Sequence, residues 1–132
     1  MDLKTWTSIF IKNRDLIKKE LDKLEVKKDS IDCFYSDREE RYIIKEHLDE
    51  AIFDKVKKKN TIIVCENKKK NVIFVYKKWK NFLKNRSLRI IFSNPEQNEK
   101  WVLRPSIHDR VTDKKTLKKG LISLYESVSP VK

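Results

Sequence analysis

The sequence predicts an α/β protein, a compact three-layer sandwich in which helices flank a small, mostly parallel central sheet. Short apolar runs rich in β-branched residues, such as Thr61–Cys65 and Leu88–Phe92, have the length and composition of buried strands. Amphipathic segments of helical length lie between such runs, and this alternation is typical of parallel sheets. A chain of 132 residues is long enough to bury a core, so we expect one α/β domain, with an N-terminal helix over 2–25 and an α/β core over 26–132.

The first half of the chain predicts two helices around one strand. Residues 2–25 carry apolar side chains at three- and four-residue steps, which indicates an amphipathic helix. A polar break follows, and residues 31–35 predict the first strand. Residues 38–58 again show helical spacing, and Glu39 and Glu40 would lie in the first turn, where acidic side chains suit the helix dipole.

Residues 71–85 are compatible with two structures. The run from Val72 to Tyr76 has the composition of a strand that could pair with Thr61–Cys65 as a hairpin. The apolar side chains of 71–85 also hold helical spacing, and Asn71 is a good N-cap for that helix. The helix is the preferred interpretation.

The C-terminal third predicts strands over 88–92 and 101–103 and a last helix over 113–128, capped by Asp113. The chain contains one glycine, Gly120, inside that helix, where we expect close helix packing to require it. Rossmann and P-loop phosphate sites need several glycines, so that backbone N–H groups can approach phosphate. Both kinds of nucleotide site are therefore excluded, and no cofactor is expected.

Cys33 and Cys65 lie inside apolar runs and belong to no Cys-x-x-Cys pair, so buried free thiols in a reducing cytoplasm are expected. No signal peptide is recognisable, and no apolar run approaches the length of a membrane span. The two cysteines and the two histidines, His47 and His108, show no zinc-site spacing, so no metal is expected from them. We expect a cytoplasmic protein with no membrane partner.

The basic charge is regional. Residues 51–92 contain 13 Lys and Arg against 2 acids, a local charge of 13 − 2 = +11, whereas residues 1–50 come to 11 − 13 = −2. Such an excess favours a polyanionic partner, DNA or RNA, bound mainly through its phosphates with little sequence specificity. The candidate nucleic-acid-binding residues are Lys57, Lys58, Lys59, Lys68, Lys69, Lys70, Lys77, Lys80, Lys84, Arg86 and Arg89.

A catalytic alternative begins with Glu66-Asn67-Lys68 at the end of an apolar strand. This triplet resembles the E-x-K of PD-(D/E)xK nucleases, a family in which acids hold a divalent metal and the lysine assists the attacking water. The resemblance implies a metal-dependent nuclease, or a degenerate relative of one, with Mg²⁺ as its cofactor. Asp37 or Asp54 would supply the missing acid. That family expects the acid on a strand that adjoins the E-x-K through a turn, whereas here a whole predicted helix intervenes and Asp54 lies on it. The alternative catalytic set is Asp37, Glu66, Lys68 and His108.

The segment from Thr61 to Asn94 is also similar in outline to the Toprim domain, in which a Glu ends one strand and a D-x-D ends the next to bind magnesium. Glu66 occupies the first position, but Ser93-Asn94-Pro95 stands where that family has D-x-D. Near the other predicted strand end, His108 lies between Arg104 and Arg110, a combination that could form an anion pocket.

A third hypothesis is a protein-interaction adaptor. The opposite charge of residues 1–50 and 51–92 could drive self-association or docking to an acidic protein partner, with Trp6 and Phe10 of the N-terminal helix as a dimer face. Non-enzymatic nucleic-acid binding is the preferred hypothesis, the metal-dependent nuclease is the second, and the adaptor is the third.

Overall fold

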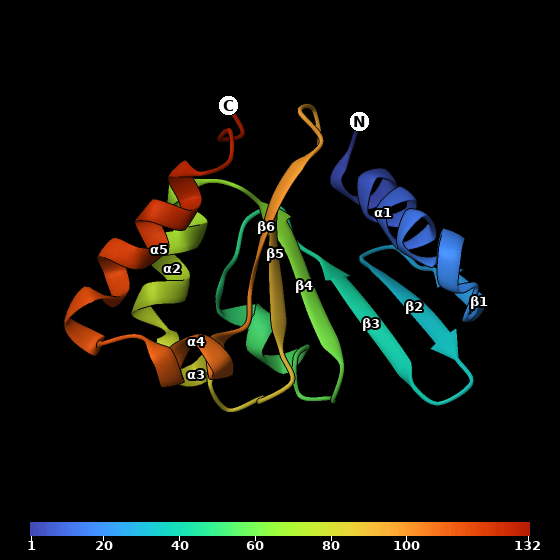
Figure 1. Ribbon diagram of the computed structural model, residues 1–132, viewed down its shortest axis with the longest axis horizontal. Helices are drawn as coiled ribbons and strands as arrows, with labels where there is room; N and C mark the ends of the chain where they lie inside the picture. The colour runs from blue at the N-terminus through green and yellow to red at the C-terminus, as the bar shows by residue number, and fades with distance from the viewer.

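The computed structural model describes residues 1–132 and contains a six-stranded sheet with the spatial order β1-β2-β3-β4-β5-β6 (Figure 1). The strands are β1 (Leu21–Val26), β2 (Ser30–Tyr35), β3 (Glu39–Ile44), β4 (Thr61–Glu66), β5 (Arg89–Asn94) and β6 (Glu99–Leu103). The helices are α1 (Leu3–Lys18), α2 (Lys69–Lys77), α3 (Trp79–Phe82), α4 (Pro105–Val111) and α5 (Leu117–Glu126), with 3₁₀ turns η1 (Glu50–Asp54) and η2 (Lys114–Thr116). None of the helices has the length and apolar character needed to cross a membrane.

The sheet is mixed, and the expectation of a mostly parallel sheet was wrong. Strands β3, β4 and β5 are parallel neighbours, whereas β1–β2, β2–β3 and β5–β6 pair antiparallel. The structure therefore confirms the α/β class but does not support the mostly parallel three-layer sandwich. The reason lies in the N-terminal half, where an antiparallel meander of β1, β2 and β3 takes the place of alternating strands and helices.

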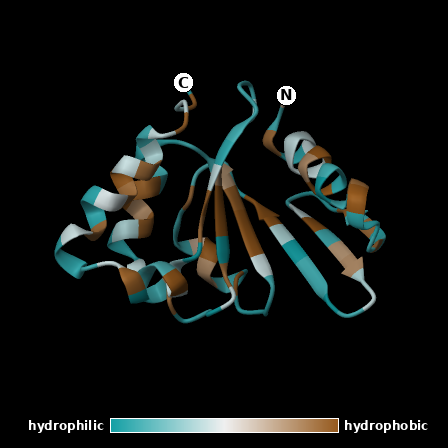
Figure 2. Cartoon of the chain, in the orientation of Figure 1, coloured by the Kyte–Doolittle hydropathy of each residue, from teal (hydrophilic) through white to brown (hydrophobic).

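Each face of the sheet carries its own hydrophobic cluster. Helix α1 contributes Leu3, Trp6 and Ile11 to a cluster with β2–β5. The opposite face is covered by η1, α2, α3 and α5, which pack against β3–β6 in a larger cluster of 18 buried residues. Figure 1 shows these two groups of helices on opposite sides of the sheet, and Figure 2 shows the central strands as mainly hydrophobic. Strand β4 is buried on both faces, which confirms the expectation for its uniformly apolar run.

The predicted helix over 2–25 is too long. Helix α1 ends at Lys18, Lys19 takes a left-handed conformation with φ 50°, and β1 begins at Leu21. The carboxylate of Asp15 accepts hydrogen bonds from the backbone N–H groups of Glu20 and Leu21, which stabilises this break. Leu21 and Leu24 stand three residues apart, which is the spacing of a helix face. In β1 both pack against the cluster under α1 because the strand is irregular between Leu21 and Lys23.

The predicted helix over 38–58 was also wrong. Residues 39–44 form β3, and only η1 is helical in the remainder. Tyr42 packs in the cluster under α1 and Ile43 packs in the cluster on the other face, as the alternation of a strand requires. Glu40 is buried rather than exposed in a first helical turn, and it accepts a hydrogen bond from Arg89 Nη2 at 3.0 Å.

The remaining elements follow the prediction more closely. Strands are confirmed at 31–35, 61–65, 88–92 and 101–103, within one or two residues of β2, β4, β5 and β6. The segment predicted over 71–85 is helical as far as Phe82 and is not a hairpin strand, although Lys68 rather than Asn71 is the N-cap and the helix divides into α2 and α3. The last predicted helix, 113–128, is η2 followed by α5, and Asp113 caps η2.

Gly120 has no close neighbour that would exclude a larger side chain. A Cβ built on it meets nothing within 4 Å, so the expected close helix packing was wrong. We predict that Gly120→Ala raises the free energy of unfolding by about 1 kcal/mol, because alanine loses less conformational entropy in a helix interior. Urea denaturation measures this change. An unchanged or lowered stability would show that the glycine serves a purpose outside its helix.

Asp32 on β2 forms ion pairs with two basic side chains, Lys27 and Arg41. Its carboxylate accepts from Arg41 Nε at 2.8 Å and lies 2.8 Å from Lys27 Nζ. Burial opposes ionisation, but the hydrogen bonds from Arg41 and Lys27 outweigh it and hold the pKa of Asp32 below its usual value.

We therefore predict that Asp32→Asn destabilises the protein by about 1–3 kcal/mol at neutral pH. The folded-state pKa is lowered, so the stabilisation is present above the unfolded value near 4 and is lost as pH falls through the folded pKa. In urea denaturation as a function of pH, wild type should lose this part of its stability below about pH 4, and the variant should not. Asp54→Asn is the control, because the Asp54 side chain is 88 % exposed.

Candidate functional site

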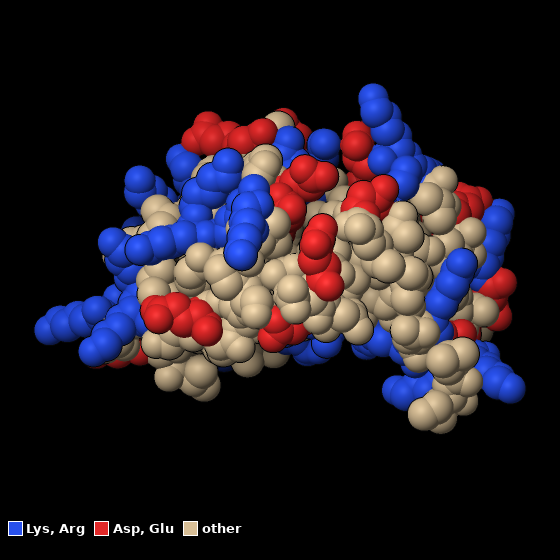
Figure 3. Space-filling model, turned by 90° about the horizontal axis from the view of Figure 1, so that it is seen from above, with Lys and Arg blue, Asp and Glu red and all other residues tan.

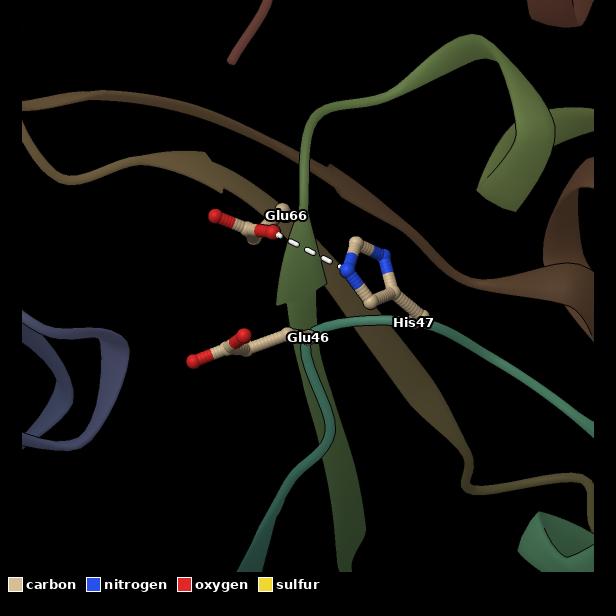
Figure 4. A group of neighbouring side chains, drawn as sticks. All are labelled: Glu46, His47 and Glu66. Carbon is tan, nitrogen blue, oxygen red and sulfur yellow. Dashed lines mark ion pairs between the residues drawn. The ribbon is translucent and has the colours of Figure 1, made fainter. Parts of the chain in front are cut away.

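The parallel strands β3, β4 and β5 end at one edge of the sheet, called the carboxyl edge below. Glu46 and His47 follow β3, and Glu66 is the last residue of β4. One potential metal-ligating atom from each of these three side chains lies within 4.8 Å of the others. In Figure 4 the side chains of Glu46 and Glu66 extend in the same direction, and the imidazole of His47 faces the carboxylate of Glu66.

Glu66 is the least exposed member of this cluster. Its side chain is 17 % exposed, and its Oε1 lies 3.9 Å from His47 Nε2 and 3.4 Å from Lys68 Nζ. Glu46 and His47 are exposed. The arrangement thus joins two carboxylates, one imidazole and one ammonium group, a set that can hold a cation or exchange a proton.

Asn71 positions the two strand ends that carry the cluster. Its buried side chain donates to the carbonyl oxygens of Glu46 and Glu66, each at 2.8 Å, and accepts from the Leu48 N–H at 2.9 Å. The Glu66 N–H also donates to the Glu46 carbonyl oxygen at 3.3 Å, which continues the β3–β4 ladder beyond β3. The loop after β3 is therefore held directly beside the end of β4.

Asn67, the middle residue of the E-x-K triplet, has a structural role. Its buried amide nitrogen donates to the carbonyl oxygens of Tyr125, Val128 and Ser129, and its oxygen accepts from Trp101 Nε1 at 2.8 Å. These bonds tie the C-terminal segment to the end of β4, so the triplet contributes only its first and third residues to the cluster.

The alternative catalytic set is only partly brought together. Glu66 and Lys68 are neighbours, but Asp37 lies in the turn between β2 and β3, and His108 lies on α4 after β6. Both β2 and β6 run antiparallel to β4, so these residues lie at the opposite edge, the length of a strand away, about 17–20 Å. Asp54, the other acid considered, lies exposed on η1.

Glu46 and His47 were missed because residues 38–58 were interpreted as one helix. The alternation of residues 40–44 between the two faces of the sheet was the signal for a strand, and it would have placed Glu46 and His47 at that strand's end. The two thiols behave as expected. Cys33 and Cys65 are free and buried, and burial raises the pKa of Cys33 to about 12 and that of Cys65 well above its usual value.

Two of the three residues of the predicted anion pocket line one cleft. Arg104 and His108 lie along a cleft of about 570 Å³ together with Arg14, Arg89 and Lys100, whereas Arg110 is not part of its lining. The floor is apolar. The His108 ring packs edge-on against Trp79 with centroids 5.9 Å apart, and its buried Nε2 has no hydrogen-bond partner.

The predicted dimer face on α1 is not open. Trp6 is buried against the sheet and donates from Nε1 to Asn98 Oδ1 at 3.0 Å, and Phe10 stacks on it with ring centroids 5.3 Å apart. The exposed apolar residues of α1 are instead Ile9, Leu16 and Ile17.

Most of the predicted nucleic-acid-binding residues are exposed cations without an ion pair. Lys57 pairs with Asp54, Lys68 with Glu66, and Arg89 with Glu40. The other eight are exposed and form no ion pair: Lys58, Lys59, Lys69, Lys70, Lys77, Lys80, Lys84 and Arg86.

The structure adds lysines from a distant part of the chain to this set. Helix α5 packs beside α2, and Lys118 Nζ lies 5.9 Å from the ring of Tyr76 on α2. Figure 3 shows a group of basic side chains at the end of the molecule that carries these helices, and further basic side chains at the opposite end. The helical basic surface consists of Lys69, Lys70, Lys77, Lys80, Lys84, Lys114, Lys115, Lys118 and Lys119, all exposed and none in an ion pair.

No protein-family model matches the chain, and neither a curated protein nor a solved structure gives a match. The geometry described above is therefore the basis for the functional argument.

We predict that Asn71→Ala destabilises the protein by about 1–3 kcal/mol, because it leaves the Leu48 N–H without a partner and removes one of the two donors of each carbonyl group. Urea denaturation gives the change in stability. Asn81→Ala is the matched control, since Asn81 is exposed and its side chain makes no hydrogen bond. Equal stability of the two variants would contradict the role assigned to Asn71.

Proposed function

We propose that this protein binds nucleic acid through the helical basic surface, mainly by contacts to the phosphate backbone. The observation that carries the proposal is that nine exposed lysines of α2, α3, η2 and α5 and the segments joining them lie in one layer without ion pairs. Phosphates attract such cations, and counterion release makes the binding free energy depend steeply on salt.

The absence of acidic side chains in part of this layer supports the proposal. Residues 69–84 contain six lysines and no Asp or Glu. One of the six, Lys78, pairs with Glu50 from η1, and the other five belong to the surface. A lysine-rich segment that served only for solubility would be expected to mix both signs of charge.

The chemistry of the surface favours contacts that do not depend on base sequence. Lysine offers a point charge and lacks the planar fork with which arginine recognises guanine. The nearby rings of Trp79 and Phe82 are buried, and Tyr76 is half-buried, so they do not form an open platform for base stacking.

The test is a charge reversal on the surface, Lys70→Glu, Lys77→Glu and Lys118→Glu combined. We expect wild type to bind duplex DNA or RNA at low salt, and the triple variant to bind at least tenfold more weakly. The slope of log K against log salt should also become shallower by about 2–3, because each lost phosphate contact removes roughly 0.9. Fluorescence anisotropy over a salt series measures both quantities.

The matched control carries the same charge change at the other end of the molecule, with Lys12→Glu, Lys18→Glu and Lys28→Glu on α1 and the β1–β2 turn. All three lysines are exposed and form no ion pair. Retained binding in this control ties the interaction to the helical surface. An equal loss in both variants, or no binding by wild type at low salt, contradicts the proposal.

A further inference from the structure

Glu46, Glu66 and Ser93 form a row across three parallel strands at the carboxyl edge. Glu66 and Ser93 are register partners of β4 and β5, and the Glu66 N–H bonds to the Glu46 carbonyl oxygen. Side chains of register partners project from the same face of a sheet. On this face Val64 and Ile91, the preceding partners, pack in the cluster under α1, so Glu66 and Ser93 project toward the same side as α1.

Ser93 supplies a second observation, independent of the acids. Its side chain is fully buried, and its hydroxyl oxygen has no hydrogen-bond partner. Buried hydroxyl groups are nearly always paired, and a water or an ion is one partner that can satisfy such a group. The unpaired hydroxyl therefore marks the space next to Glu66 as a position for a polar ligand.

His47 determines which ligand suits that position. Imidazole with two carboxylates is the donor set of zinc and other first-row divalent metals, whereas magnesium prefers oxygen ligands alone. Ligand atoms around a tetrahedral zinc ion lie roughly 3.4 Å apart, given metal–ligand distances of about 2.0–2.2 Å. The present separations, at most 4.8 Å, can close by rotation of the exposed Glu46 and His47 side chains.

We propose that Glu46, His47 and Glu66 form a binding site for one divalent first-row metal ion, with Zn²⁺ preferred, and that Ser93 bonds to a water on that ion (Figure 4). Three protein ligands leave a coordination position open for water, as in zinc sites that are not purely structural. The three ligands are distinct from the lysines of the helical basic surface, so metal binding can be tested without nucleic acid.

The charge of Lys68 leads to a second prediction, in which a substitution strengthens metal binding instead of weakening it. Its ammonium group lies 3.4 Å from Glu66 Oε1, so it repels a cation and competes for one of its ligands. Removing this charge should strengthen metal binding, whereas removing a ligand should weaken it. A non-specific attraction of metal to surface acids would not require His47.

The experiment is isothermal titration calorimetry of the full chain with ZnCl₂, MnCl₂ and MgCl₂. Wild type should bind one Zn²⁺, bind Mn²⁺ more weakly and Mg²⁺ more weakly still. His47→Gln should weaken Zn²⁺ binding at least tenfold, and Lys68→Met should strengthen it severalfold. His108→Gln is the matched control, because His108 is the second histidine of the chain and lies at the opposite edge of the sheet.

Two further measurements distinguish this site from metal binding by the thiols and from a loss of folding in the variant. The absorption spectrum of the Co²⁺ complex should lack a thiolate charge-transfer band, because both cysteines are buried away from solvent. Urea denaturation without metal should give the same stability for His47→Gln as for wild type, since His47 is exposed. Failure of wild type to bind one Zn²⁺, equal affinity of the two histidine variants, or a thiolate band would overturn the proposal.

Discussion

The burial of β4 on both faces is the constraint on which the rest of the structure depends. Residues 61–65 are all buried, so this strand must have a strand on either side and helices above and below. Helix α1 covers one face, and η1, α2, α3 and α5 cover the other. Because β3 and β5 run parallel to β4, the same constraint brings three strand ends together at the carboxyl edge.

Two buried asparagines extend this constraint beyond the strand. Asn67 binds the backbone of the C-terminal segment, and Asn71 binds the backbone of the loop after β3. Asn71 also accepts from the Leu48 N–H, and a buried backbone group left without a partner costs about 1–3 kcal/mol. The end of β4 is therefore held from both directions, and the side chains of Glu46, His47 and Glu66 start from a fixed backbone.

The parts of the fold that the sequence predicted are those determined by local apolar pattern, namely β2, β4, β5, β6 and the helical segments α2, α3 and α5, whereas α4 was not predicted. It failed at β1 and β3, whose apolar side chains also fit helical spacing, although both strands pair with β2, their neighbour in the chain. The place of β3 in the sheet also depends on contacts that are distant in sequence. Glu40 bonds to Arg89, 49 residues away, and the sequence around Glu40 gives no sign of such a pair.

The candidate site was also predicted only in part. The Glu66–Lys68 pair was visible as a motif, whereas Glu46 and His47 join it only through the β3–β4 pairing. The lysines of α5 were missed because a count of charge along the chain cannot show that α5 packs beside α2.

The two proposed sites meet at the start of α2. Lys68 pairs with Glu66 of the metal-ligating cluster, whereas Lys69 and Lys70, its neighbours in the chain, belong to the helical basic surface. An ion bound by Glu66 would take the place of the Lys68 ammonium group and leave that charge without its acidic partner. A cation gained at the cluster and a lysine released beside the basic surface both make this end of the molecule more positive, so the two binding events would favour each other. The direction of this coupling follows from charge alone and requires no change in the fold.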